Sequence, residues 1–126
     1  MFECKKILNG RGNVPEPEVH TVGSKEITAG MALNLSGGVL VEATGAPTHI
    51  ALADAAANTK VACYAVLPGM IFDVPLSAAP TNLKEGVKVT IANSRLEVTA
   101  TTTDGVVTIV NLNGATKAGD IIQVKF

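Results

Sequence analysis

The chain has 126 residues, of which 47% are hydrophobic, 17% charged and 3% aromatic, and its formal net charge is −1. This length fits one domain, and the scattered basic residues and near-absence of aromatic side chains exclude a nucleic-acid-binding surface. The low charge indicates that a partner covers part of the apolar surface, either a second copy or another protein; alternatively, the chain is simply an alanine-rich domain.

The first 25 residues are expected to form a short strand followed by an extended arm. Residues 2–8 carry a strand pattern, whereas residues 9–23 contain three glycines, Pro15 and Pro17, and no hydrophobic period. Proline fixes φ and lacks an amide hydrogen, so this stretch favours an extended or polyproline conformation. The sequence therefore predicts an arm or long surface loop in front of a body at residues 26–126.

Short strands separated by turn residues follow along the body. Alternating segments such as 87–92 and 121–126 are typical of half-buried antiparallel strands. The one plausible helix, at residues 52–57, is too short to be stable by propensity alone. About nine short strands predict an all-β fold, a small antiparallel β-barrel or sandwich with an extended N-terminal arm. These strands are expected at 27–35, 39–43, 49–53, 61–67, 70–76, 87–92, 96–102, 106–112 and 121–126.

A glycine opens three of the alternating segments. Gly30, Gly86 and Gly119 each stand immediately before or next to the start of a strand pattern. Glycine enters the left-handed region without steric cost, so a tight turn with positive φ is predicted at each of the three.

The histidines and cysteines suggest no metal or cofactor site. Neither His20 nor His49 has an acidic or cysteine partner at metal-ligand spacing, so we interpret both as surface or turn residues. Cys4 and Cys63 are far apart and form no CxxC, which indicates free thiols in a reducing compartment, a single bridge between them being the alternative. Cys63 lies in an apolar segment and is expected in the core.

The aspartates do not suggest a catalytic pair. Turn chemistry explains Asp104, next to Gly105, and Asp120, next to Gly119, and alternation places Asp73 on the solvent face. We therefore expect that the protein is not an enzyme and has no catalytic residues. A polar pocket around His49 and Asp54 would favour the opposite interpretation.

Five segments of the chain, taken together, form a pattern of strands and turns that resembles a known family. They are the segments at 29–35, 39–45, 49–55, 68–76 and 118–126, which combine short apolar strands with glycine turns. Together they resemble the small β-rich proteins of tailed bacteriophages that coat the outside of the head, the capsid decoration or auxiliary capsid proteins. The resemblance covers about residues 26–126 and contains no catalytic motif.

The resemblance implies a structural virion protein that binds the outer surface of a phage capsid. It would stabilise the expanded head by bridging subunits of the major capsid protein, as a homo-oligomer, with a trimer favoured. It would be synthesised in the host cytoplasm and located on the capsid exterior, with no nucleic-acid or membrane partner. No apolar run reaches the roughly 18–20 residues that span a bilayer.

The arm is the expected place of capsid contact, because an extended segment can add a strand to a neighbour's sheet. An unattached loop is the alternative for this segment. A second function remains open: a β-barrel binding module for a glycan or protein ligand, possibly a host-adhesive head protein. The expected capsid-binding residues are Arg11, Asn13, Val14, Pro15, Glu16, Pro17 and Glu18.

Overall fold

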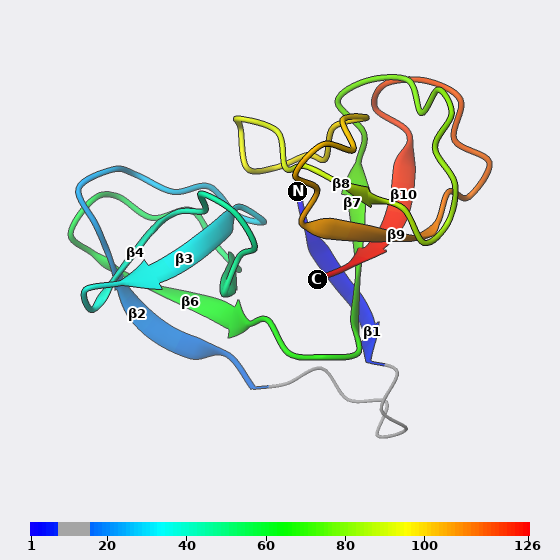
Figure 1. Cartoon of the computed structure of the whole chain (residues 1–126). Coiled ribbons are helices and arrows are strands. Elements are labelled where there is room, and N and C mark those ends of the chain that lie inside the picture. The colour runs from blue at the N-terminus through cyan, green and yellow to red at the C-terminus, as the bar shows by residue number, and fades with distance from the viewer. Residues whose placement is uncertain (8–15) are drawn as a thin grey trace.

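A computed structural model describes residues 1–7 and 16–126, and this part of the chain is built from strands and loops (Figure 1). Within these described residues, ten strands form two sheets, one closed into a barrel and one open. The predicted all-β class is confirmed. In the described residues there is no helix, and therefore none long and apolar enough to cross a membrane.

The first sheet is a five-stranded closed barrel, here called the barrel lobe. Its strand order is β2-β4-β3-β5-β6, and β2 closes the barrel by pairing antiparallel with β6 and parallel with β4. Closure leaves this sheet without a free edge. The strands are β2 (Glu18–Val22), β3 (Ala32–Ser36), β4 (Val39–Glu42), β5 (His49–Ala51) and β6 (Lys60–Ala65).

The second sheet is open and forms what is here called the sheet lobe. Its order is β1-β7-β10-β9-β8, so the N-terminal strand pairs with a strand from the second half of the chain. The edge strand β1 carries a bulge between Cys4 and Lys6, and β8 has only two residues. The strands are β1 (Glu3–Ile7), β7 (Met70–Pro75), β8 (Lys88–Val89), β9 (Val107–Asn111) and β10 (Ile121–Lys125).

Alternation along the strands builds two hydrophobic cores. In β10, Ile122 and Val124 are fully buried while their neighbours are partly or wholly exposed, as predicted for period-two strands. The larger core contains Phe72 and also includes Ala32 and Ile50 of the barrel lobe, so it spans both lobes. A smaller core fills the barrel with Val22, Ile27, Met31, Leu33, Leu40, Ala51, Val61 and Cys63.

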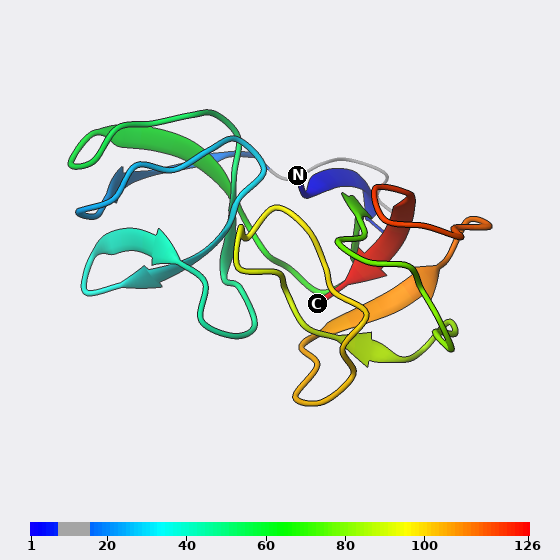
Figure 2. The ribbon, with the colours of Figure 1, turned by 90° about the horizontal axis from the view of Figure 1, so that it is seen from above.

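Backbone contacts join the lobes, which lie side by side in both views (Figures 1 and 2). The amide of Phe2 donates to the carbonyl of Gly30 at 2.9 Å, and the amide of Ala32 donates to the carbonyl of Arg95 at 2.9 Å. The lobes therefore share a core and a set of hydrogen bonds.

The N-terminal segment differs from the expected arm. The predicted strand at residues 2–8 is present as β1, but Glu18–Val22 form β2 inside the barrel. The interpretation of residues 9–23 as an arm or loop is therefore wrong for β2, where pairing to β6 on one side and β4 on the other outweighs the nearby prolines. The segment at 8–15 lies outside the described residues.

One further expectation is corrected: residues 96–102 form no strand beyond bridges at Val98. Residues 52–57, judged too short for a stable helix, form bends and an isolated bridge between Ala55 and Ile27. The three glycine turns are present, with φ of 78° at Gly30, 87° at Gly86 and 87° at Gly119.

Candidate functional site

A cluster of polar side chains lies on three neighbouring barrel strands. β6 lies between β5 and β2, and Cys63 on β6 pairs with Ala51 on one side and Glu18 on the other. His20 and His49 stand diagonally to Cys63, each two residues from its direct partner. Diagonal neighbours on one face of a sheet are within reach of long side chains. The sheet register thus brings together residues that are up to 45 positions apart.

The two imidazoles converge on one carboxylate oxygen. Oε2 of Glu18 lies 2.8 Å from Nε2 of His20 and 3.0 Å from Nε2 of His49. The ring centroids are 5.1 Å apart at an interplanar angle of 78°. The donor atoms of His20, His49 and Cys63 all lie within 4.8 Å of one another.

The cluster runs from the barrel interior to the surface. Cys63 is fully buried and the side chain of His49 is 9% exposed, whereas the side chains of His20 and Glu18 are 26% and 48% exposed. Glu18 and His20 share a strand face with the buried Val22, since they alternate with it along β2. Solvent therefore reaches the cluster from the Glu18 side.

Electrostatics within the cluster shift two groups. Burial, followed by the charge of Glu18, raises the pKa of the Cys63 thiol to about 11. Hydrogen bonds from His20 and then His49 hold the pKa of Glu18 below its usual value. In the absence of an ion, the cluster therefore contains a carboxylate and a protonated, unreactive thiol at neutral pH.

A second hydrogen bond orients the His49 ring. Its Nδ1 lies 2.9 Å from Oγ1 of Thr48, and this oxygen also accepts the amide of Leu35 at 3.0 Å. The ring is thus held at both nitrogens, by Thr48 on one side and Glu18 on the other.

The expectation for the two histidines was wrong. His49 is buried rather than at the surface, and both histidines have an acidic partner and a nearby cysteine. Part of this arrangement was visible as Glu18-Val19-His20, because residues two apart on a strand share a face. The contributions of His49 and Cys63 depend on strand register, which spacing along the chain does not reveal. The prediction that Cys63 lies in the core is confirmed.

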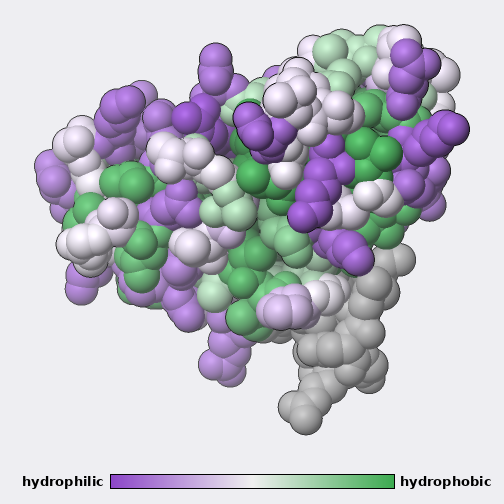
Figure 3. Space-filling model, in the orientation of Figure 1, coloured by the Kyte–Doolittle hydropathy of each residue, from purple (hydrophilic) through white to green (hydrophobic). Residues whose placement is uncertain are grey.

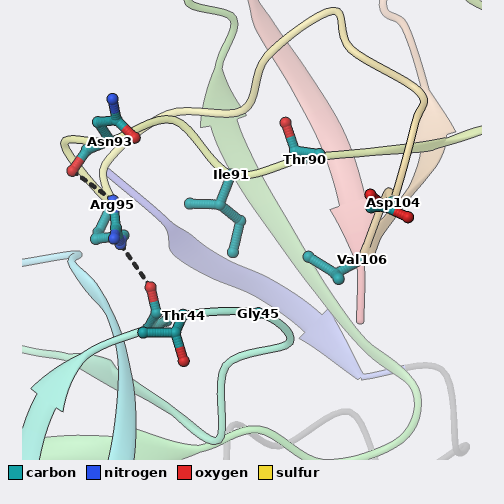
Figure 4. A pocket seen from close by; sticks show the side chains of 9 residues that line it. Thr44, Gly45, Thr90, Ile91, Asn93, Arg95, Asp104 and Val106 are labelled. Atoms are coloured by element: carbon teal, nitrogen blue, oxygen red, sulfur yellow. Dashed lines mark hydrogen bonds between the residues drawn. The ribbon is translucent and has the colours of Figure 1, made fainter.

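A polar hollow lies where the lobes meet (Figure 4). Thr44 and Gly45 of the barrel lobe face Thr90, Asn93 and Asp104 of the sheet lobe across it. The Arg95 side chain at its rim is engaged by backbone carbonyls, with Nε donating to Ala43 at 2.5 Å and Nη1 to Asn93 at 2.7 Å. The hydroxyl of Thr90 is also hydrogen-bonded to the hydroxyl of Thr99 at 2.7 Å.

The other aspartates are engaged separately. Asp54 accepts the amide of Ala29 at 2.7 Å, whereas His49 is bonded to Glu18, so these two residues do not act together. Asp120 accepts the amides of Thr116 and Lys117 at 2.8 and 3.1 Å, which confirms its role in a turn.

The expected capsid-binding residues are only partly described. Arg11, Asn13, Val14 and Pro15 lie outside the described residues, and Glu16 and Pro17 are exposed ahead of β2. Glu18 begins β2 and is bound to the two histidines.

Exposed apolar side chains gather around the N-terminus. Met1 lines one hollow with Leu52 of the barrel lobe and a second with Ile121 of β10. These three side chains, here called the apolar junction, are 52%, 38% and 47% exposed. The face in Figure 3 also shows hydrophobic surface running between the lobes, with hydrophilic groups projecting from the outer parts.

Comparisons with known proteins identify no family. No protein-family model matches the chain, and no curated protein sequence matches it.

Proposed function

We propose that the protein is a structural component of a tailed-phage head, binding the outer surface of the expanded capsid and stabilising it by bridging major capsid protein subunits. The resemblance of residues 26–126 to capsid decoration proteins supports this function. The structural observation that carries the proposal is the apolar junction, which contains side chains from both lobes.

The apolar junction suits a flat protein partner. Met1, Leu52 and Ile121 are each exposed over between 38% and 52% of their surface. Covering that area would stabilise the contact by about 1 kcal/mol per side chain. Such modest gains add up when the same contact recurs over a shell of identical subunits.

We propose that the described part of the protein contacts the capsid through its side chains and not by adding a strand to a capsid sheet. The barrel has no free edge, and the β1 edge has a bulge and a 2.8 Å ion pair between Lys5 and Glu3. Bulges and charges disfavour pairing with another strand. Residues 11–17 remain the second proposed contact, with Glu18 assigned to the histidine cluster instead.

Co-sedimentation with expanded, undecorated heads of the phage that encodes the protein tests the proposal. We expect saturable binding at a fixed ratio to the major capsid protein, weakened at least tenfold by Leu52→Glu or Ile121→Glu. Val41→Glu is the matched control, because Val41 has the same 38% exposure as Leu52 but lines a different hollow. Absence of saturable binding by the wild type would contradict the proposal.

The N-terminal contact needs its own variant. Deletion of residues 1–23 would remove β1 and β2 and so damage both lobes. Replacing Arg11, Asn13 and Val14 by serine preserves both strands, and reduced binding to heads would assign the contact to this segment.

The polar hollow favours a second candidate, a glycan-binding module. Thr44, Thr90, Asn93 and Asp104 present hydroxyl, amide and carboxylate groups, which are the groups that hydrogen-bond sugars. This function would be supported if the isolated protein binds a glycan and Thr90→Val abolishes that binding. If the protein also fails to bind heads, glycan binding becomes the preferred function.

A further inference from the structure

We propose that His20, His49 and Cys63, with Glu18 as a fourth ligand, form a binding site for a zinc-type divalent ion at one end of the barrel. The site is independent of capsid binding. Its basis is that the donor atoms of His20, His49 and Cys63 lie within 4.8 Å of one another, with the Glu18 carboxylate in contact with both histidines.

The donor set matches the chemistry of zinc. Zinc is bound in proteins by imidazole nitrogen, thiolate sulfur and carboxylate oxygen, and structural sites are four-coordinate. The cluster supplies two imidazoles, one thiol and one carboxylate. A thiol together with imidazoles selects a borderline-soft ion over Mg²⁺ or Ca²⁺, which prefer oxygen ligands only.

The geometry is close to that of an occupied site. A tetrahedral zinc ion with bonds of about 2.0–2.3 Å keeps its ligand atoms roughly 3.3–3.7 Å apart. The nitrogen and sulfur atoms of His20, His49 and Cys63 lie within 4.8 Å of one another. A contraction of roughly 1 Å, achieved by side-chain rotation, is enough to close the site around an ion of this bond length.

Glu18 already contacts both ring nitrogens. Its Oε2 is 2.8 and 3.0 Å from the two Nε2 atoms, so both rings present the same nitrogen to one point. An ion bound by the two Nε2 atoms would replace these two hydrogen bonds by coordination bonds, and the Glu18 carboxylate would shift away from the rings to become the fourth ligand.

The surroundings of His49 suit a ligand. Metal-bound histidines donate their other ring N–H to an oxygen, which fixes the ring. Nδ1 of His49 lies 2.9 Å from Oγ1 of Thr48, an oxygen that can accept this hydrogen beside the amide of Leu35. Nε2 then carries no hydrogen and can bind the ion in place of its contact with Glu18.

The ion would tie three strands together. Cys63 lies on β6, His49 on β5, and His20 with Glu18 on β2. Cys63 would bind as the thiolate, releasing its proton to solvent, because a coordinating thiol is deprotonated. The expected consequence is a barrel that is more stable with the ion than without it.

A metal titration of the tag-free full chain tests the proposal. The protein is treated with a chelator, dialysed, and titrated with Zn²⁺ alone and, separately, with Co²⁺ as a spectroscopic probe. We expect one ion per chain, a rise in melting temperature, and a thiolate-to-cobalt charge-transfer band in the near ultraviolet. His20→Gln should weaken the apparent affinity at least tenfold, and Cys63→Ser should remove the band.

Two controls separate the site from chance binding. Cys4→Ser removes the other thiol, which lies on β1 in the sheet lobe, and should leave affinity and band unchanged. His20→Gln changes a partly exposed side chain, so the fold should persist even if Cys63→Ser destabilises the core. No saturable binding, equal affinity in His20→Gln, or a band that depends on Cys4 would overturn the proposal.

Discussion

Arg95, in the loop between β8 and β9, donates a hydrogen bond from Nε to the carbonyl oxygen of Ala43, which directly follows β4, at 2.5 Å. The same guanidinium donates from Nη1 to the carbonyl of Asn93 at 2.7 Å. One side chain thus links the barrel lobe to the sheet lobe and also holds its own loop. The carbonyl of Arg95 accepts the amide of Ala32, so the residue joins the lobes through its backbone too.

Arg95→Ala is therefore expected to destabilise the protein by about 1.5–3 kcal/mol, the range for hydrogen bonds that involve a charged group. Chemical denaturation measures this as a lower midpoint. Lys88→Ala, which removes an exposed cation from β8, serves as the control and should change the free energy of unfolding by less than about 0.5 kcal/mol. Equal midpoints for wild type and Arg95→Ala would show that the link between the lobes contributes no net stability.

Gly105→Ala should be strongly destabilising for a steric reason. A Cβ at this position would lie 2.5 Å from the carbonyl carbon and oxygen of Lys88 and 2.8 Å from the amide nitrogen of Val89. These are backbone atoms of β8 that cannot rotate away. We expect a cost of about 1–3 kcal/mol or more, as for other overpacked sites.

Gly45→Ala is the matched control for Gly105→Ala. A Cβ at Gly45 meets nothing within 4 Å, and neither glycine has a positive φ. The two variants thus differ in the space available to the added methyl group. Gly105→Ala should therefore have a much lower melting temperature than Gly45→Ala. Similar melting temperatures would contradict the close approach of the Gly105 turn to β8.

The sequence was informative where a local rule decides the structure. Positive φ at Gly30, Gly86 and Gly119 follows from turn chemistry, and burial of Ile122 and Val124 follows from alternation along a single strand. For the same reason the all-β class could be predicted without knowledge of any strand pairing.

The sequence was misleading where distant pairing decides the structure. Glu18–Val22 follow two prolines closely, yet β4 and β6 hold them in the barrel. Residues 96–102 alternate like a strand, yet Arg95 has φ of 61° and the segment makes only bridges, at Val98. The histidine cluster belongs to the same class, because it exists only once β2, β6 and β5 are in register.

Asp120 should make stability depend on pH. Hydrogen bonds from the amides of Thr116 and Lys117 hold its pKa below the usual value. A carboxyl whose pKa is depressed in the folded state stabilises that state above the unfolded pKa of about 3.9, and this contribution disappears as the pH falls through the folded value. The variant Asp120→Ala should therefore melt below wild type at pH 7, with the gap narrowing in acid.

Melting curves at neutral and acidic pH check this expectation. Glu26→Ala removes another carboxylate from an exposed position and serves as the control variant. If the difference in melting temperature between wild type and Asp120→Ala stays constant or widens in acid, the charge of Asp120 does not stabilise the fold through these amides.

The two cysteines should differ in their reactivity toward alkylating reagents. The nucleophile is the thiolate, and burial raises the pKa of Cys63 to about 11, so little thiolate is present at pH 8 and the sulfur is inaccessible. Cys4 is only partly buried on β1. Limited iodoacetamide treatment followed by peptide mass spectrometry should therefore find Cys4 modified well before Cys63, whereas unfolding in denaturant should equalise the two rates. Early modification of Cys63 in the native protein would mean that the barrel opens at β6 far more readily than a closed, fully paired sheet allows.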